Sequence, residues 1–264
     1  MKVGFFQFAP RFKDKEANLI QIERVLETTE FDLLVLPELS ITGYAFGSRD
    51  ELLPFAESIP GPTTERLISR LGERILILGL AMVEDDNLYN VAVALTQQKI
   101  HIYEKVHLFR KEKEIFTPGR TGFSVFDYCG FKIGLMICFD WIYPEAARSL
   151  ALHGADIIAH PSNLVLPYCQ DAMVTRSLEN RVFIITANRI GVEREYRFTG
   201  KSQITGPEGE VLIRVGEEEV VKVIEIDPGR SREKRITPEN DLFQDRRPEL
   251  YFSDLQLPEN RRLR

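Results

Sequence analysis

Cysteine and histidine are scarce in this chain. Its 264 residues include three cysteines, Cys129, Cys138 and Cys169, and four histidines. An odd and sparse set of cysteines forms no disulfide framework, and the spacings include no Cys-x-x-Cys or His-x-x-x-His pair. The sequence therefore contains no metal-binding motif built on these residue types, and we expect no metal site.

Long apolar runs and clusters of one charge are also missing. No run approaches the roughly 18 residues that span a membrane, and the first residues lack the apolar core of a signal peptide. The net charge is −6, and the Lys and Arg residues form no basic stripe, which argues against nucleic acid as the main partner. We therefore expect a cytoplasmic protein that binds neither a membrane nor nucleic acid.

The composition is that of a globular protein. Hydrophobic residues make up 44% of the chain and charged residues 28%, and a chain of this length buries a substantial core without disulfides. No linker, shift in composition or internal repeat divides it. We predict one domain over residues 1–264, in which residues 228–264, rich in Arg, Glu and Pro, form a C-terminal arm.

Hydrophobic periodicity predicts an alternation of strands and helices. Apolar runs predict strands over residues 3–8, 32–37, 75–83, 89–96, 100–104, 123–128, 131–137, 155–160, 182–187, 202–205, 211–215 and 220–226. Amphipathic spacing predicts helices over residues 18–28, 63–71, 144–153 and 171–180. Strands that alternate with helices, with hairpins between them, indicate a layered α/β sandwich with a mixed sheet.

One apolar segment ends on a cysteine. In residues 134–141, Gly-Leu-Met-Ile-Cys-Phe-Asp-Trp, a strand-like apolar run ends sharply at Cys138, and the only tryptophan of the chain, Trp141, follows three residues later. Such a strand end would hold a thiolate on a rigid support. A buried core thiol is the alternative, since free cysteine is among the most buried residue types. A nucleophile also needs a base or a positive neighbour, because a free thiol has a pKa of about 8.5.

Two charged residues lie where predicted strands end. Glu38 directly follows strand 32–37, at the sheet edge where α/β proteins bind ligands. An acid in an apolar pocket has the raised pKa that a general base needs, so Glu38 is a candidate general base. The alternative is that Glu38 caps a helix or is a solvated acid in a loop. Lys105 follows strand 100–104 and has apolar neighbours. Lys105 is therefore open to two interpretations: a buried ammonium that stabilises a thiolate or an oxyanion, or an ordinary surface charge.

Two further residues are open to a structural interpretation. Glu112 lies in the charged run Arg-Lys-Glu-Lys-Glu at residues 110–114, whose composition predicts a solvated segment. His107 lies between Val106 and Leu108, which favours a structural histidine over a Cys/His partner of the papain type.

Several motifs together resemble the nitrilase superfamily, whose members are also called carbon–nitrogen hydrolases. The similarity extends from about Val3 to Tyr251, and the motifs follow one another in the order of that family. They are Pro-Glu-Leu at 37–39 with Thr-Gly-Tyr at 42–44, Tyr-Glu-Lys-Val-His-Leu-Phe at 103–109, Glu112 ahead of Phe-Thr-Pro-Gly at 116–119, Ile-Cys-Phe-Asp-Trp at 137–141 with Pro-Glu at 144–145, His-Pro-Ser-Asn at 160–163 and Arg-Ser-Leu-Glu-Asn at 176–180.

The resemblance implies a role for each matching residue. Cys138 would attack the carbon of an amide or nitrile, and Glu38 would take the thiol proton and later activate water. Lys105 and the backbone N–H of Phe139 would form the oxyanion hole, while Glu112 would hold Lys105 and the substrate amine. This is two-step covalent catalysis through a thioester acyl-enzyme, without a metal or a cofactor.

The resemblance also implies an architecture. The family fold is a four-layer α-β-β-α sandwich with mixed sheets, and its members form dimers through helices, often with a C-terminal arm. The helices 144–153 and 171–180 are the expected interface of a homodimer or higher homo-oligomer. The segment 245–251 is the expected arm, and ordinary packing within the chain is the alternative for both.

The resemblance indicates the class of substrate less directly than the fold. Within the family that the chain resembles, many true nitrilases have Cys-Trp-Glu around the nucleophile, whereas the arrangement Cys138-Phe139-Asp140 is more frequent in amidases and carbamoylases. The resemblance therefore favours hydrolysis of an amide over a nitrile, with release of ammonia and a carboxylic acid. A true nitrilase and an N-carbamoyl amine or amino-acid amidohydrolase remain alternatives, and an inactive binding protein of the same fold is a remote one. We expect Tyr44, Trp141 and Tyr168 to line the substrate pocket, and a core tryptophan is the alternative for Trp141. A substrate carboxylate would need a cation, for which the sequence offers Arg176, Arg189 and Arg194.

Overall fold

The computed structural model describes residues 1–251. The chain forms two compact units, residues 1–233 and residues 234–264. As far as it is described, the second unit consists of the strand pair β15 (Arg235–Thr237) and β16 (Asn240–Asp241) and the short 3-10 helix η4 (Pro248–Leu250). The predicted arm 228–264 therefore begins within the first unit, and its residues 252–264 lie outside the described part.

The first sheet of the larger unit has six strands in the order β14-β1-β2-β3-β4-β5. Its central strands β1, β2 and β3 are parallel, and β14 and β4 flank them antiparallel. The edge strand β5 is antiparallel to β4 and therefore runs in the same direction as β3. The bounds are Lys2–Gln7 for β1, Leu33–Val35 for β2, Ile75–Glu84 for β3, Asn87–Leu95 for β4, Ile100–Glu104 for β5 and Val220–Glu225 for β14.

The second sheet repeats this plan with six strands in the order β13-β12-β9-β8-β7-β6. Here β7, β8 and β9 are parallel, and the outer strands are antiparallel to their neighbours. The bounds are Val125–Tyr128 for β6, Phe131–Leu135 for β7, Ile157–Ser162 for β8, Phe183–Asn188 for β9, Gln203–Thr205 for β12 and Val211–Arg214 for β13.

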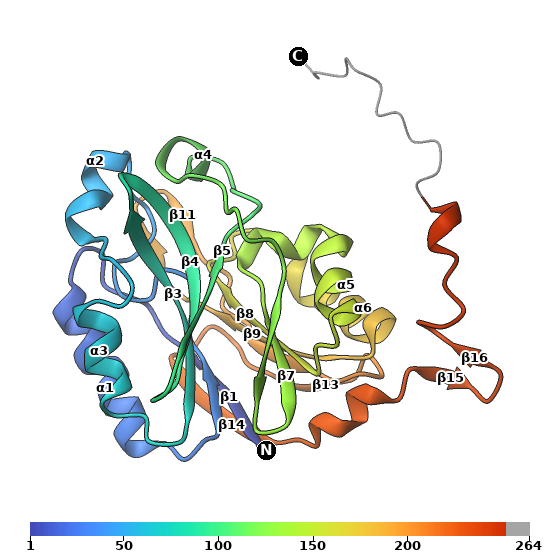
Figure 1. The fold of residues 1–264 in the computed structure, drawn as a ribbon. Coiled ribbons are helices and arrows are strands. Elements are labelled where there is room, and N and C mark those ends of the chain that lie inside the picture. Colours follow the sequence, from blue (N-terminus) through green and yellow to red (C-terminus); the bar gives the residue numbers. More distant parts are fainter. Residues whose placement is uncertain (252–264) are drawn as a thin grey trace, which may run out of the picture. The chain divides into compact units, whose positions relative to one another are not determined.

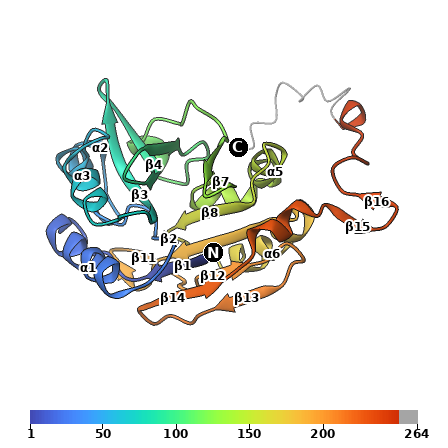
Figure 2. The ribbon, with the colours of Figure 1, turned by 60° about the horizontal axis from the view of Figure 1, so that its bottom comes forward.

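The two sheets pack face to face and helices cover their outer faces. Strands β1, β2 and β3 contact β8 and β9. Helices α1 (Lys15–Thr28) and α3 (Pro62–Ile68) cover the first sheet, whereas α5 (Pro144–Leu152) and α6 (Cys169–Asn180) cover the second, as Figures 1 and 2 show. The order of layers in this unit is helix, sheet, sheet, helix, which confirms the predicted α-β-β-α sandwich.

Helix α1 illustrates how the sequence builds these layers. The side chain of Asp14 accepts a hydrogen bond from the N–H of Ala17 at 3.0 Å and caps the first turn, which satisfies one of the free N–H groups of a helix start. Leu19, Ile22 and Leu26 repeat at helical spacing and are buried against the first sheet. This apolar stripe fixes which face of the helix packs inward.

Every predicted strand and helix is present, with ends that differ by a few residues. The short elements α2 (Arg49–Leu52), α4 (Glu112–Ile115), β10 (Val192–Glu193) and β11 (Tyr196–Arg197) were not predicted, because two to four residues carry too little periodicity. Cys129 and Gly130 both have positive φ, 51° and 80°, which is the backbone of a tight hairpin turn. Within residues 1–251, no helix is long and apolar enough to cross a membrane.

Candidate active site

The ends of four strands meet at one edge of the sandwich. Glu38 follows β2, Lys105 follows β5, Cys138 follows β7 and Asn163 follows β8. The amide of Asn163 donates to the backbone oxygen of Glu38 at 2.9 Å, so this contact joins the second sheet to the first. Crevices at the carboxyl ends of strands are where open α/β sheets bind ligands.

Lys105 lies between two carboxylates in the interior. Its Nζ is 2.6 Å from Oε1 of Glu38 and 2.8 Å from Oε2 of Glu112. The side chains of Lys105 and Glu38 are wholly inaccessible to solvent and that of Glu112 is 4% exposed. Burial alone would lower the pKa of Lys105, but the two carboxylates outweigh it and raise that pKa. Lys105 is therefore a buried ammonium, as one of the two sequence interpretations proposed.

The solvated segment predicted around Glu112 is wrong for this residue. A single helical turn, α4, exposes Lys113 and Glu114 and turns Glu112 and Ile115 inward. The Glu112 carboxylate accepts the backbone N–H of Phe109 at 3.0 Å, in addition to its ion pair. Composition averages over the run, whereas the helical turn decides the burial of each residue separately.

Tyr44 completes the shell around Glu112. Its hydroxyl donates to Oε1 of Glu112 at 2.7 Å. Tyr44 is buried, so the expected pocket residue contacts the charged cluster itself. Burial first, and then the nearby carboxylates of Glu112 and Glu38, raise the pKa of Tyr44, which keeps the phenol protonated and donating.

Glu38 has one oxygen engaged and one without a partner. Its Oε1 accepts from Lys105 and from the side-chain amide of Asn90 at 2.7 Å, while Oε2 is buried without a hydrogen bond among the described residues. Burial raises the pKa of Glu38, and the Lys105 charge opposes this without reversing it. A buried carboxylate with a free oxygen and a raised pKa has the properties of a proton acceptor.

The segment of Glu38 lies unusually close to β3. Gly79 accepts the N–H of Ser40 at 3.0 Å and donates to the oxygen of Pro37 at 3.1 Å. A Cβ at Gly79 would lie 2.4 Å from Cα of Glu38, so only glycine lets the two backbones come this near.

Cys138 stands on a strained turn. It begins the 3-10 helix η2 (Cys138–Ile142) with φ of 38°, a value that is costly for a residue with a side chain and that is common at functional sites. Its carbonyl accepts from Nε2 of His160 at 2.9 Å. Burial lowers the pKa of His160 to about 4, so the ring is neutral at pH 7 and donates this proton.

A second buried network supports the same turn. Asp140 accepts the N–H of Ile137 at 2.8 Å and the hydroxyl of Tyr103 at 2.8 Å, and its other oxygen lies 2.8 Å from Nδ1 of His107. The ring of His107 stacks on Tyr143 with centroids 3.7 Å apart. These contacts agree with the structural interpretation of His107, which supports the turn of the cysteine through Asp140.

The thiol itself is held in its neutral form. Burial raises the pKa of Cys138, and the carboxylate of Glu38 raises it further. Lys105 and the backbone N–H of Asn163 act in the opposite direction without reversing the shift. The sulfur is therefore a thiol at rest, and it would need a base to become a nucleophile.

A small pocket opens on the sulfur. It is lined by Phe109, Phe139, Trp141, Asn163 and the segment 164–166, and its volume is about 10 Å³, roughly the room that one water molecule needs. The rings of Phe109 and Phe139 lie 4.9 Å apart across it. Phe139 and Trp141 therefore lie beside Cys138, whereas the exposed Tyr168 does not line this pocket.

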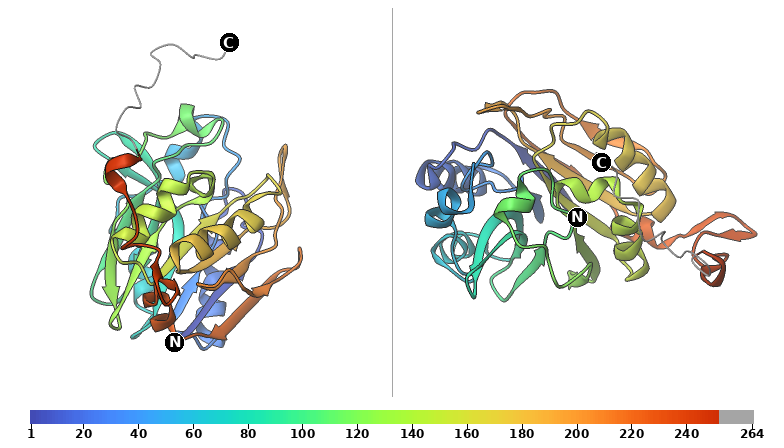
Figure 3. Two further views of the ribbon diagram at one scale, coloured as in Figure 1. Left: turned by 90° about the vertical axis from the view of Figure 1, so that its right-hand side faces the viewer. Right: turned by 90° about the horizontal axis from the view of Figure 1, so that it is seen from above.

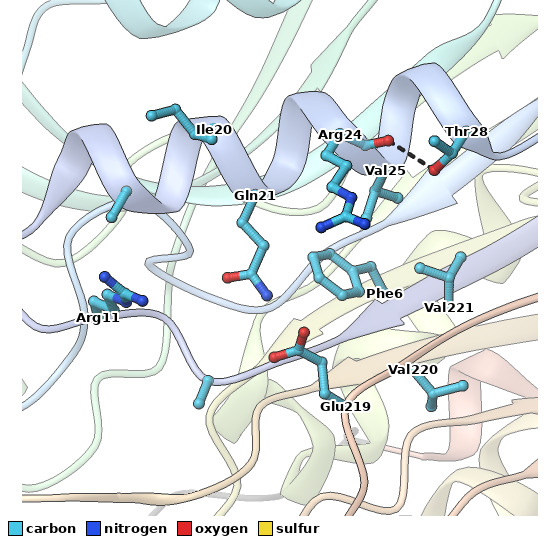
Figure 4. Close-up of a pocket in the computed structure, with 12 residues that line it drawn as sticks. Phe6, Arg11, Ile20, Gln21, Arg24, Val25, Thr28, Glu219, Val220 and Val221 are labelled. Carbon is cyan, nitrogen blue, oxygen red and sulfur yellow. Dashed lines mark hydrogen bonds between the residues drawn. The ribbon is translucent and has the colours of Figure 1, made fainter.

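Wider hollows lie elsewhere and lack this chemistry. A groove of about 780 Å³ runs between α1 and β14, with Gln21 and Arg24 above it and Glu219 below it in Figure 4. None of the residues that line it belongs to the Lys105 cluster or lies next to Cys138. Volume alone therefore does not identify the site. Among residues 1–251, no group of three His, Cys, Asp or Glu side chains could hold a metal ion.

The three arginines considered for a substrate carboxylate all have partners within the chain. Arg189 pairs with Glu193, Arg194 with Glu51 and Arg176 with Glu179. None of the three lines the pocket at Cys138.

Sequence reasoning did not single out Asn90 as part of this site, and it quoted Asn163 only within a motif. Asn90 is the polar residue inside the apolar run Leu-Tyr-Asn-Val-Ala-Val, and a buried amide in such a run needs a partner. Asn163 follows the apolar strand β8 in the same way that Glu38 follows β2. Both signals are visible in the sequence once strand interiors and strand ends are searched for polar residues.

The chain is similar to known proteins over almost its whole length. The chain is 46% identical over 260 residues to a nitrilase of Pyrococcus abyssi, an alignment that covers 96% of this chain and 99% of that protein. A carbon-nitrogen hydrolase from Helicobacter pylori has the same fold with a TM-score of 0.84 at 26% identity, covering 97% of this chain and 98% of that one.

A third comparison concerns an amidase from Nesterenkonia. Its structure matches with a TM-score of 0.80 at 25% identity, covers 96% of this chain and 99% of that one, and is described with acrylamide added at the active site cysteine. The family model for carbon-nitrogen hydrolases matches residues 2–236, and the chain is therefore a member of the carbon–nitrogen hydrolase family, the nitrilase superfamily.

Proposed function

We propose that this enzyme hydrolyses a small-molecule amide through a thioester on Cys138. The observation that carries the proposal is the buried cluster of Glu38, Lys105 and Glu112, whose charges act on the nearby thiol of Cys138. Within this cluster, Glu38 keeps a free carboxylate oxygen. A protein that only binds a ligand has no need of a buried cation between two carboxylates, because such clusters contribute little net stability. The names of the relatives, nitrilase and amidase, support the same class of reaction.

In the first half of the reaction the thiol becomes a thioester. Glu38 takes the proton of Cys138 as the sulfur bonds to the amide carbon, and the carbonyl electrons move onto oxygen. Lys105 and the backbone N–H of Phe139 stabilise this oxyanion, since the first N–H groups of η2 have no partner within their helix. The carbonyl then re-forms, the C–N bond breaks, and the proton on Glu38 passes to the departing ammonia.

In the second half water releases the acid. Glu38 takes a proton from water as its oxygen bonds to the thioester carbon, and the same donors stabilise the second oxyanion. The C–S bond breaks, the sulfur regains its proton, and the carboxylic acid leaves. Glu112 holds Lys105 in place and accepts from the substrate amine.

The preference for amides rests on the resemblance of Cys138-Phe139-Asp140 to the family's amidases, and two other substrate classes test it. A nitrile would pass through a thioimidate on the same sulfur, and an N-carbamoyl compound would release carbon dioxide as well as ammonia. A panel of aliphatic amides, ω-amides, nitriles and N-carbamoyl amino acids, assayed for both gases, separates the three. Turnover of nitriles or carbamoyl compounds alone would contradict the preference for amides.

Trapping the acyl-enzyme tests the nucleophile. Mass spectrometry of enzyme quenched during turnover should show the acyl group on the peptide that contains Cys138, and Cys138→Ala should abolish both adduct and turnover. Cys169→Ala is the matched control, because Cys169 is equally buried but lies at the start of α6. Full turnover by Cys138→Ala would refute the mechanism.

We also propose that the protein is a homodimer that uses α5 and α6. These helices lie side by side on the second sheet, yellow-green and gold in Figure 3, and Leu152 and Leu178 on them are 44% and 45% exposed. Leu178→Glu should give a monomer in sedimentation, and an unchanged mass would reject this surface. A cytoplasmic location, a single functional domain and a C-terminal arm remain parts of this proposal.

A further inference from the structure

Tyr44 reaches the charged cluster from a loop that has no regular structure of its own. Its hydroxyl is 2.7 Å from Oε1 of Glu112, so the position of this loop sets one of the contacts of Glu112. The main supports of Tyr44 come from one distant part of the chain, residues 189–198, which include the hairpin β10–β11.

The first support holds the backbone. Oε1 of Glu193 accepts the N–H of Tyr44 at 2.7 Å and that of Ala45 at 2.5 Å. The preceding Gly43 has φ of 79°, and a Cβ there would lie 2.9 Å from Oε2 of Glu193. The loop is therefore pressed against this carboxylate, and glycine is required both for the turn and for the close contact.

The second support holds the ring. Tyr196 meets the Tyr44 ring edge to face, with centroids 5.6 Å apart and planes at 80°, and Phe198 does so at 5.9 Å and 88°. Edge-to-face contacts are a favoured geometry of aromatic pairs. Together the two rings leave the hydroxyl of Tyr44 as the end that reaches the cluster.

Arg189 connects the two supports. Its Nη1 is 2.9 Å from Oε2 of Glu193, its guanidinium carbon is 4.1 Å from the centroid of Phe198, and Nη2 donates to the oxygen of Pro10 at 3.3 Å. Arg189 and Glu193 are both buried, 2% and 6% exposed. Buried ion pairs add little net stability over apolar residues of the same size, and their best-attested use is to specify one geometry.

We propose that the Arg189–Glu193 pair is a positioning device, which fixes Tyr44 and through it Glu112 and Lys105 in their working geometry. This rests on the proposed function of that cluster. It assigns Arg189 a place inside the fold in preference to contact with a substrate carboxylate. It also gives a purpose to a buried charged pair that the proposed chemistry does not touch.

A double-mutant cycle on kcat tests the proposal. Tyr44→Phe removes only the hydroxyl, and Glu193→Ala removes the acceptor that holds the loop. Each should lower kcat by about 10- to 100-fold, the size expected when a reacting group is misplaced by about 1 Å. KM should change little, because neither side chain lines the pocket at the sulfur. The double variant should be no slower than the slower single variant, since both changes break one connection.

Two further variants separate positioning from stability. Glu193→Gln keeps an oxygen for both backbone N–H groups and should recover most of the lost kcat. Arg194→Ala is the matched control in the same hairpin: Arg194 pairs with Glu51 at the surface, and its loss should leave kcat unchanged. If Glu193→Ala does not fold, Arg189→Lys enters the cycle in its place, because lysine keeps the charge and loses the planar fork.

The outcomes are distinct. Effects of Tyr44→Phe and Glu193→Ala that multiply in the double variant would overturn the proposal, and so would a Tyr44→Phe variant with the kcat of the parent enzyme. Cys138→Ala is assayed in parallel, because retained turnover in that variant would refute the proposed function of the cluster rather than the role of Arg189 and Glu193.

Discussion

Replacing Lys105 by methionine should destabilise the enzyme in a pH-dependent way. Methionine keeps an unbranched apolar side chain of similar length, so the change removes mainly the charge. It leaves Glu38 and Glu112 buried without their shared cation, which now lies 2.6 Å and 2.8 Å from them. Removing one member of a buried ion pair destabilises a protein by about 3–5 kcal/mol. For a unit of this size that corresponds to a fall in Tm of about 6–20 °C.

The sign of the pH dependence follows from Glu38. Burial raises its folded-state pKa, and Lys105 opposes this shift, so the variant should raise it further. A carboxyl group with a raised folded-state pKa contributes stability that is fully present below its unfolded pKa of about 4.3, and this contribution is lost as the pH rises through the folded-state value. The difference between variant and parent should therefore be largest at neutral and alkaline pH and shrink toward about pH 5.

Urea unfolding of both proteins across this pH range measures the difference. Lys132→Met is the control, because Lys132 is 43% exposed and lies 3.3 Å from the exposed Asp127, and surface pairs of this kind contribute about 0–1 kcal/mol. A penalty at Lys105 that is independent of pH, or no larger than that at Lys132, would refute the reasoning about the buried cluster.

Three further changes test parts of the site. The acid limb of the pH profile of kcat/KM should lie above the ordinary carboxyl pKa of 4.5, because burial raises the pKa of Glu38. Asn90→Ala removes an amide whose hydrogen bond lowers the pKa of Glu38, so this variant should move the acid limb to higher pH. An unmoved limb would exclude Glu38 as its source. Gly79→Ala places a Cβ 2.4 Å from a backbone atom and should destabilise the protein by about 3 kcal/mol or more in urea unfolding. Gly47→Ala is its control and should change stability little, because the new Cβ would meet only the ends of two flexible side chains, the nearer 3.3 Å away. Asp140→Asn weakens the acceptor that holds the turn of Cys138 and should lower kcat about tenfold or more in steady-state assays. A normal kcat would show that this network does not position the sulfur.

The layers and half of the site could be predicted because they depend on local patterns. Buried parallel strands are continuous apolar runs, so their ends are visible in the sequence as the first polar residues that follow. Glu38 is the first polar residue after β2, and Cys138 ends the apolar run that contains β7. Lys105 directly follows β5, an edge strand that contains His101 and Glu104. Once the strands are known to share a sheet edge, their proximity follows from topology, and the structure places Glu38 and Lys105 within 2.6 Å of each other.

Glu112 and Arg189 could not be located in this way, because their burial depends on distant partners. Glu112 lies in a segment whose other charges are exposed, and only the turn of α4 and the hydroxyl of Tyr44, 68 residues away, make it an interior carboxylate. Arg189 was considered for a substrate carboxylate, since a lone arginine in the sequence shows no partner. Its pairing with Glu193 depends on the hairpin β10–β11, and strands of two residues are too short to be predicted from the sequence.

The hydrogen bonds of the two carboxylates explain why Glu38, rather than Glu112, is the proton acceptor in the proposed mechanism. Glu112 accepts from Lys105, from the hydroxyl of Tyr44 and from the N–H of Phe109, so donors surround both its oxygens. A proton that moved to Glu112 would have to displace one of these donors. Glu38 receives both of its donors on one oxygen, and the other is buried and free. A proton can therefore bind to Glu38 without displacing a donor.

The charge balance of the cluster then determines when that proton moves. One ammonium faces two carboxylates, and a thiolate on Cys138 would add a third negative charge to a buried site, which agrees with the raised pKa of the thiol. Transfer of the proton to Glu38 removes one negative charge as another develops on the sulfur. When the sulfur bonds to the substrate carbon, the negative charge moves to the carbonyl oxygen, where Lys105 can stabilise it. Under the proposed mechanism, deprotonation and attack are thus coupled, in contrast to a Cys–His pair, where the thiolate exists before the substrate arrives.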